Sequence, residues 1–417
     1  MRNTTSRPVP RPLVVLVLAL ALVVAGLLGA GAAAAESQEP VAEPVVTGES
    51  SSPEPTVITC GLSRATVVFG DSVTARGVVT PAAQGVEVAV SLGGADVATA
   101  VTDDTGAYSA AFKPHRGGSV VARVVADGTT AEPLALAVKP RVTVTRGAAV
   151  PFLKTRFVVK VAPLAYDGVV TARVSHRGAA AGTYRVRVRN GRAVFRIPLR
   201  GIDWFTVTFA LPSDGGLAAR SAQKKVDVNW RRLTVGSSGA HVKGMLTGLV
   251  RLKIRVPGMS TRFSSRTRDA VVAFQKAYRL PRTYVFAYAD WRKLDGARPV
   301  KPRYASPAVH IEVDKTRQIL MIVRSGKVSG LIAVSTGATG NTPEGAFRIQ
   351  QKHPYTSTFS GGGMLYRTMG FLGNFAIHGW VPVPPYPASH GCVREPMWVA
   401  QWVYGQSWVG ERVYIYR

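Results

Sequence analysis

The sequence has little cysteine: only Cys60 and Cys392 occur in 417 residues. A chain with so few thiols is not a small disulfide-stapled scaffold. It also has no Cys-x-x-Cys pair and no His-Glu-x-x-His segment, the spacings that are typical of zinc sites. We therefore expect no bound metal and no cofactor, and we look for a chemical role for a single thiol.

Charged residues are absent from one long apolar segment near the N-terminus. It runs from Leu13 to Ala35, ends in four alanines, and follows Arg2, Arg7 and Arg11. Arginines before an apolar run are typical of an export signal. Residues 1–35 are therefore predicted to be a signal peptide or, since about 20 apolar residues can span a bilayer, a membrane anchor. Both alternatives predict an extracytoplasmic protein.

Acidic residues are scarce: 24 Asp and Glu stand against 52 Lys and Arg, a net charge of +28. The first 35 residues contribute +3 and residues 36–57 contribute −5, so the rest of the chain carries +30. A nucleic-acid partner is the usual interpretation of so basic a body, but export argues against it. Anionic wall polymers and phospholipid headgroups are the remaining polyanions, and surface charge that aids solubility is an equal alternative.

The chain after the export segment divides into a spacer and four folded units. Residues 36–57 combine Pro with Glu, Ser and Thr and are predicted to be a disordered linker. Short strand patterns broken by Gly and Asp turns predict two β-sandwiches that resemble immunoglobulin-like domains, at 58–139 and 140–230. Asn190-Gly191 between two alternating segments predicts a β-hairpin over 184–197.

Residues 231–297 change to a helical pattern. Val242, Met245, Leu246 and Leu249 form one apolar stripe, and a second stripe follows Ser264, a candidate N-cap. This segment resembles the small three-helix peptidoglycan-binding domain. Binding of glycan by this unit and a purely structural spacer role are both compatible with the pattern.

The last unit, 306–417, is predicted to be rich in β-strands and contains the chemistry. Ile377-His378-Gly379 is followed after nine residues by Ser389-His390-Gly391-Cys392-Val393-Arg394. A thiol attacks carbonyls as its thiolate and needs a nearby base. Histidine supplies that base, while backbone N–H groups of Gly391 and Cys392 are candidate donors to an oxyanion. The segment therefore predicts acyl transfer by Cys392.

This signature resembles that of the L,D-transpeptidases (YkuD type). The likeness extends upstream through Val334-Ser335-Thr336-Gly337 and from Asn341 to Ile349, and it covers about residues 308–417. It implies that His378 is the base, that the Gly379 carbonyl orients it, and that His390 supports the site. From the sequence alone His390 remains a rival base, because it lies two residues from Cys392.

The resemblance implies a reaction and a set of contacts. A peptidoglycan tetrapeptide stem would acylate Cys392, release D-alanine and form a 3→3 cross-link in the wall of a bacterium. The rivals are an L,D-carboxypeptidase and an inactive peptidoglycan-binding structural protein. A disulfide between Cys60 and Cys392 is rejected because it would consume the nucleophile, and Cys60 is expected to be a small buried residue. The residues expected to contact the stem peptide are Arg394, Ser389, Tyr366, Met364 and Trp380.

Overall fold

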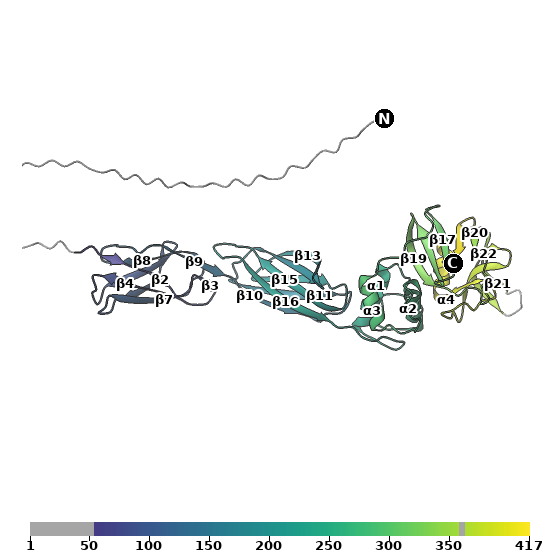
Figure 1. Ribbon diagram of the computed structural model, residues 1–417, viewed down its shortest axis with the longest axis horizontal. Coiled ribbons are helices and arrows are strands. Elements are labelled where there is room, and N and C mark those ends of the chain that lie inside the picture. Colours follow the sequence, from purple (N-terminus) through teal and green to yellow (C-terminus); the bar gives the residue numbers. More distant parts are fainter. Residues whose placement is uncertain (1–53, 358–362) are drawn as a thin grey trace, which may run out of the picture. The chain divides into compact units, whose positions relative to one another are not determined.

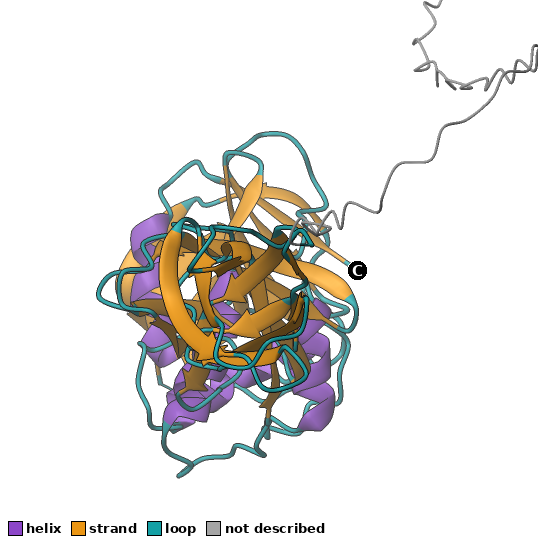
Figure 2. Cartoon of the chain, turned by 90° about the vertical axis from the view of Figure 1, so that its left-hand side faces the viewer, coloured by secondary structure: helices purple, strands orange, loops and turns teal. Residues whose placement is uncertain are grey.

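The structure, a computed structural model, describes residues 54–357 and 363–417. The predicted export segment, most of the linker and residues 358–362 lie outside the described residues. The chain from Glu54 to Arg417 forms one unit by its internal contacts. Strands predominate in it, with four helices among the described residues (Figure 2). No described helix is both long enough and apolar enough to cross a membrane.

The first β unit has two sheets whose inward faces share one hydrophobic core. Alternating buried and exposed positions along its strands account for this arrangement, as in Ala107–Phe112, where Tyr108, Ala110 and Phe112 point inward. One sheet has the order β1-β4-β2 with β7 paired to β4, and the other has the order β3-β9-β8-β5-β6. The strands are β1 (Val57–Ile58), β2 (Gly61–Leu62), β3 (Thr66–Val68), β4 (Val73–Thr80), β5 (Glu87–Leu92), β6 (Ala95–Val101), β7 (Ala107–Phe112), β8 (Gly118–Val124) and β9 (Leu134–Lys139).

The second β unit also has two sheets, ordered β10-β11-β14 and β13-β12-β15-β16 (Figure 1). Its strands are β10 (Arg141–Arg146), β11 (Lys154–Ala162), β12 (Val169–His176), β13 (Ala179–Arg187), β14 (Arg192–Pro198), β15 (Asp203–Leu211) and β16 (Arg220–Val228). The predicted hairpin is wrong in one respect. Asn190-Gly191 does make a tight turn, but β13 and β14 belong to different sheets and only Arg189 and Arg192 pair across it. The turn therefore joins the two sheets, a choice that local turn chemistry does not decide.

The helical unit has the three predicted helices, α1 (Ala240–Arg251), α2 (Ser265–Ala277) and α3 (Tyr288–Gly296). The predicted stripe of α1 is fully buried. Ser264 caps α2, since its hydroxyl accepts a hydrogen bond from the Thr267 N–H at 3.3 Å. The sequence therefore predicted both the helix register and one helix boundary correctly.

The catalytic unit has two sheets. The first has the order β19-β18-β17-β25-β20 and the second the order β21-β22-β23-β24. Its elements are β17 (His310–Asp314), β18 (Ile319–Arg324), β19 (Lys327–Ala333), β20 (Gly345–Arg348), β21 (Gln351–Ser357), β22 (Met364–Leu372), β23 (Phe375–Trp380), β24 (Val393–Pro396), α4 (Met397–Gln406) and β25 (Arg412–Tyr416).

The helical unit and the catalytic unit share a hydrophobic core. One cluster contains Phe274 and Trp291 from the helices together with Met321 and Leu331 from β18 and β19. Helix α2 packs against both of these strands. Trp398 of α4 also donates its indole N–H to Asp269 of α2 at 3.0 Å. The two units are therefore joined by burial of apolar surface as well as by hydrogen bonds.

Lys276 of α2 lies inside this junction with only 1% of its surface exposed. Its Nζ donates to the Val334 carbonyl oxygen at 2.7 Å, just before the segment that pairs with the active-site strand β24. Burial and, to a smaller extent, the positive charge of the nearby Arg282 together lower the pKa of Lys276 to about 7. An ammonium group this deeply buried is costly, so the charge state of Lys276 is coupled to folding.

We expect the stability contributed at Lys276 to rise with pH. Because the pKa of Lys276 falls from its ordinary 10.5 to about 7 on folding, the unfolded chain binds the extra proton between these values. The free energy of unfolding of the wild type, relative to Lys276→Met, should therefore increase by at most about 1.4 kcal/mol per pH unit from pH 7 upward. Urea denaturation of both proteins at pH 6 to 9 measures this. Parallel pH profiles would contradict it.

Candidate active site

The two histidines and the cysteine of the C-terminal signature line one cleft of about 650 Å³. Among the residues predicted to act there, those that line it are Cys392, His378, His390, Ser389, Arg394 and Trp380. Strands β23 and β24 run parallel, with Ile377 opposite Val393 and His378 opposite Arg394. This register brings residues 378 and 392 to the same end of the sheet from sequence positions 14 apart.

His378 is held as a neutral base. It is 2% exposed, and its Nδ1 lies 3.1 Å from the Gly379 carbonyl oxygen. Since a carbonyl only accepts, Nδ1 carries the proton and Nε2 is left with its lone pair. Burial lowers the pKa of His378 to about 4, with the hydrogen bond to Gly379 opposing and the Arg394 charge assisting. The carbonyl partner implied for His378 by the sequence resemblance is therefore present.

Cys392 is a half-buried thiol with few polar neighbours. Burial raises its pKa, while a backbone hydrogen bond from Ala376 and the positive charge of Arg394 act in the opposite direction. Its Sγ lies 3.5 Å from the Asn374 carbonyl oxygen. Burial therefore favours the uncharged thiol of Cys392 over its thiolate.

The turn at residues 389–392 is fixed by side chains that bind three consecutive carbonyl oxygens. Asn341 Nδ2 donates to the His390 oxygen at 2.8 Å, Thr342 Oγ1 to the Gly391 oxygen at 2.6 Å, and Ser389 Oγ to the Cys392 oxygen at 2.5 Å. We call these three bonds the carbonyl clamp. The clamp sets the direction of the peptide units on either side of the nucleophile.

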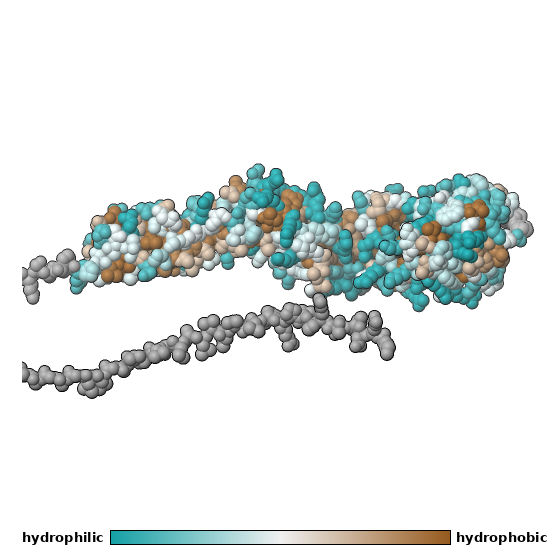
Figure 3. Space-filling view, turned by 90° about the horizontal axis from the view of Figure 1, so that it is seen from above, coloured by the Kyte–Doolittle hydropathy of each residue, from teal (hydrophilic) through white to brown (hydrophobic). Residues whose placement is uncertain are grey.

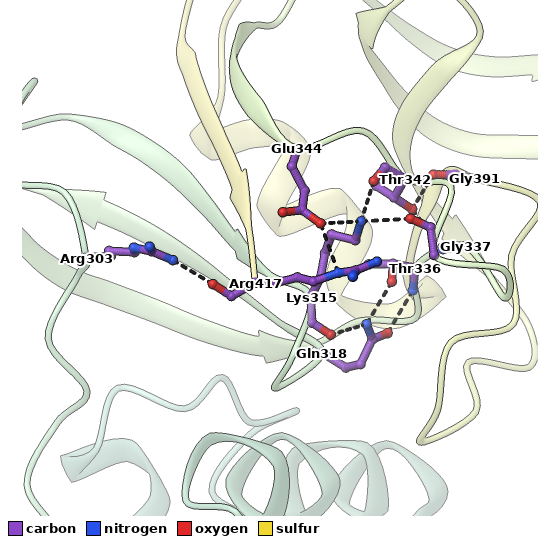
Figure 4. A network of polar contacts seen from close by, with 10 residues as sticks. Arg303, Lys315, Gln318, Thr336, Gly337, Thr342, Glu344, Gly391 and Arg417 are labelled. Carbon is purple, nitrogen blue, oxygen red and sulfur yellow. Dashed lines mark hydrogen bonds and ion pairs between the residues drawn. The ribbon is translucent and has the colours of Figure 1, made fainter.

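Thr342 has a second contact, because its hydroxyl also accepts from the Gly337 N–H at 2.8 Å. The turn that carries Thr342 is itself held by Lys315, whose buried ammonium group donates to the carbonyl oxygens of Gly340 and Thr342 and to Glu344 (Figure 4). Thr342 lies in the sequence motif from Asn341 to Ile349, but the motif predicts no role for its side chain. Its partners lie 5 and 49 residues away, and no local pattern reveals them.

Gly391 must be glycine at this position. Its φ is 139°, and a Cβ there would lie 2.6 Å from the Phe375 ring. Its N–H, predicted to be an oxyanion donor, instead donates to Ser389 Oγ at 3.0 Å. The Cys392 N–H has no hydrogen-bond partner among the described residues, so it is the available donor of the two.

Two other predicted roles change. Ser389, expected to contact substrate, is 2% exposed and uses its hydroxyl within the turn. Met364 and Tyr366 were also expected there, but the described cleft lining takes Leu365, Thr368 and Gly370 from β22. The pairing of β22 with β23 is irregular between Tyr366 and Met369, so the alternation of side chains along β22 changes phase there.

The tryptophans divide between the cleft and the domain junction. Trp380 lines the cleft, with its ring perpendicular to that of His378 and under the guanidinium of Arg394 at 5.1 Å. Trp398 bonds Asp269, and Trp402 lies under Arg255 at 4.5 Å. These two tryptophans therefore pack within the protein, the more frequent place of this residue type, and do not line the cleft. They lie on α4, which the sequence pattern did not predict.

His390 lines the cleft but is exposed. Its side chain has no hydrogen bond to another described residue, whereas His378 is anchored through Nδ1. Both cysteines are free thiols; Cys60 is half-buried rather than buried and lies near Tyr108 in the first β unit. No three His, Cys, Asp or Glu side chains of residues 54–357 and 363–417 group closely enough to hold a metal ion.

Comparisons with known proteins identify the family to which the C-terminal unit is similar. The sequence profile of the L,D-transpeptidase catalytic domain (YkuD) matches residues 308–415. A solved L,D-transpeptidase from Xylanimonas cellulosilytica is 31% identical, over 45% of this chain and 98% of that chain, with a TM-score of 0.43. The chain belongs to the L,D-transpeptidase family. No curated protein sequence matches it.

Further solved L,D-transpeptidases are more distant. One from Stackebrandtia nassauensis is 21% identical over 46% of this chain and 95% of that chain, with a TM-score of 0.31. One from Mycobacterium smegmatis is 12% identical over 67% of this chain and 100% of that chain, with a TM-score of 0.25. The family assignment rests on the profile match to residues 308–415 and on the 31% identity to the Xylanimonas cellulosilytica protein.

Removing the single hydroxyl group of Thr342 should lower both the stability of the protein and the rate at which Cys392 is acylated. Thr342→Val keeps the shape but leaves the Gly391 oxygen and the Gly337 N–H unpaired, which should cost about 1–3 kcal/mol of stability. It should also slow acylation of Cys392. Thr342→Ser keeps the hydroxyl and is the control. Denaturation and acylation rates measure the two effects, and equal behaviour of both variants would contradict the clamp.

The pH dependence of Cys392 alkylation should report its surroundings. Because burial raises the pKa of this thiol, its reaction with iodoacetamide should increase with pH to a midpoint above that of an ordinary cysteine. Arg394→Gln should move the midpoint further up, and Arg394→Lys, which keeps the charge, should move it less. Peptide mass spectrometry separates Cys392 from Cys60. A midpoint that Arg394→Gln leaves unchanged would exclude the guanidinium effect.

Proposed function

We propose that this chain is an exported, cysteine-dependent L,D-transpeptidase that forms 3→3 cross-links in peptidoglycan. The observation that carries the proposal is the tautomer of His378. With Nδ1 bonded to the Gly379 oxygen, only Nε2 can accept a proton, and Cys392 lines the same cleft. Membership of the family and the predicted export segment support the substrate and the compartment.

The first half-reaction is acylation of the enzyme. His378 Nε2 takes the proton of the Cys392 thiol, and the sulfur attacks the carbonyl carbon of the third residue of a tetrapeptide stem. The Cys392 N–H donates to the oxygen that becomes negative. When the tetrahedral intermediate collapses, the C–N bond to the terminal D-alanine breaks, and the leaving amine takes the proton back from His378. The product is a thioester.

The second half-reaction transfers the acyl group. An amine of a neighbouring stem loses a proton to His378 and attacks the thioester carbonyl, the C–S bond breaks, and the thiolate of Cys392 regains the proton. Arg394 supports binding of an anionic substrate group, since its guanidinium lines the cleft and Nη1 donates to the Ala388 oxygen at 2.9 Å. Water in place of the amine would give hydrolysis.

Mass spectrometry of the purified protein with a disaccharide-tetrapeptide tests this function. We expect a covalent adduct that is lost in Cys392→Ala and forms about 10²–10⁴-fold more slowly in His378→Gln, because the general base is removed. Dimeric muropeptides should accumulate. Tripeptides without dimers would identify a carboxypeptidase, and an unreactive Cys392 in the wild type would identify a structural protein that has lost catalysis.

A further inference from the structure

One face of the second β unit carries closely spaced positive side chains. It is the outward face of the three-stranded sheet β10-β11-β14, and the sequences of these strands contain no Asp or Glu. We call it the cationic face. Its exposed basic side chains on the two neighbouring strands β11 and β14 are Lys154, Arg156, Lys160, Arg192 and Arg196.

The register places like charges directly opposite each other. Arg156 pairs with Arg196, and Lys160 pairs with Arg192. Cross-strand partners have Cβ atoms about 4.5–5.5 Å apart, and like charges at that spacing are destabilising. No carboxylate lies within ion-pair distance of these four side chains among the described residues. The sheet therefore bears a repulsion that an anion placed over each pair would relieve.

The opposite sheet of the same unit behaves differently. There Arg187 pairs with Asp167 and Arg177 with Asp203, both at 2.8 Å. Exposed Arg173, Arg185 and Lys225 of that sheet also have no carboxylate partner among the described residues, but each lies opposite a threonine rather than opposite another cation. Over the view of Figure 3, by comparison, hydrophilic residues predominate and hydrophobic residues occur in separate small groups. Of the two sheets of this unit, only the cationic face has cations placed directly opposite each other.

The chemistry of the face indicates what covers it. The two like-charged pairs lie four residues apart along β11, about 13 Å, so one small anion cannot serve both. An extended polymer with several anionic groups can contact both pairs. The aromatic residues of these strands, Phe157 and Phe195, are buried in the core, which leaves nothing on which nucleic-acid bases could stack. The outward aliphatic residues Val158 and Val194 are buried and half-buried, so the face has no apolar side chain to insert into a membrane.

We propose that the cationic face binds a linear phosphate-bearing polymer, with one phosphate group bridging Arg156 and Arg196 and another bridging Lys160 and Arg192. Guanidinium groups match phosphate oxygens in two-pronged geometry. The site is separate from the catalytic cleft and does not depend on the proposed acyl transfer. It would hold the enzyme to an anionic polymer of its surroundings.

Binding of long-chain inorganic polyphosphate to the purified full chain tests the proposal. The face variant combines Arg156→Gln, Lys160→Gln, Arg192→Gln and Arg196→Gln. The control variant removes equal charge from exposed cations of the first β unit, by Arg64→Gln, Arg76→Gln, Lys113→Gln and Arg116→Gln. We expect the face variant to lose at least about tenfold in affinity and the control to lose much less. Binding to the wild type should fall about 10- to 100-fold between 50 and 200 mM salt.

Thermal unfolding adds a second readout that does not use binding. Arg196→Gln should raise the melting temperature at low salt, because it removes one like-charged pair, and the gain should vanish at high salt. Polyphosphate should raise the melting temperature of the wild type but not of the face variant. Unchanged acylation of Cys392 in the face variant verifies that it is folded.

Three results would overturn the proposal. Equal loss of affinity in the face and control variants would mean that net charge alone binds the polymer. No loss in either would place binding elsewhere. Face-dependent binding to vesicles of anionic phospholipid, without binding to polyphosphate, would identify a membrane surface as the partner.

Discussion

The carbonyl clamp is the constraint on which the active site depends. A cysteine in a tight turn has no fixed direction unless the peptide units around it are fixed, and here side chains of Asn341, Thr342 and Ser389 bind the carbonyl oxygens of residues 390, 391 and 392. With its carbonyls held, the turn offers the Cys392 N–H to the cleft. In the proposed reaction, the thiol of Cys392 and this N–H donor would thus be oriented before substrate arrives, which would leave little reorganisation for the chemical step.

Burial gives the same site its acid–base character. The cleft side of β23 holds His378 almost completely buried, so the pKa of the imidazole is lowered, and burial raises the pKa of the Cys392 thiol. Both shifts favour the neutral pair over the ion pair. Charge develops only when the proton moves, and it then interacts with Arg394 and backbone dipoles in surroundings of low polarity, where such interactions are strong. Gly379 contributes twice, because its oxygen anchors His378 and its missing Cβ lets Ala400 of α4 approach.

Local signals in the sequence predicted what local physics decides. The Ser264 cap and the apolar stripe of α1 both appear where the pattern placed them. The signature at 378–392 also identified the cleft residues Cys392, His378, Arg394 and Trp380.

What the sequence did not predict depends on contacts between distant segments. The assignment of β13 and β14 to different sheets, the engagement of the Gly391 N–H by Ser389, and the roles of Thr342 and Lys315 all require the folded chain. The placement of Leu365 rather than Met364 or Tyr366 in the cleft follows from a one-residue phase along β22, and β22 pairs irregularly with β23 near Tyr366. Periodicity alone cannot fix that phase.

The shared core of the helices and β18–β19 has a consequence for how such proteins can be recombined. Leu331 and Met321 would face water if the helices were cut away, and Phe274 and Trp291 would lose their partners on the other side. A domain boundary placed between residues 297 and 306 separates two sequence modules, but it cuts through one shared hydrophobic core. Grafting this catalytic sheet behind a foreign module would therefore require replacing the lost apolar contacts, and the intact pair is the smallest portable fragment.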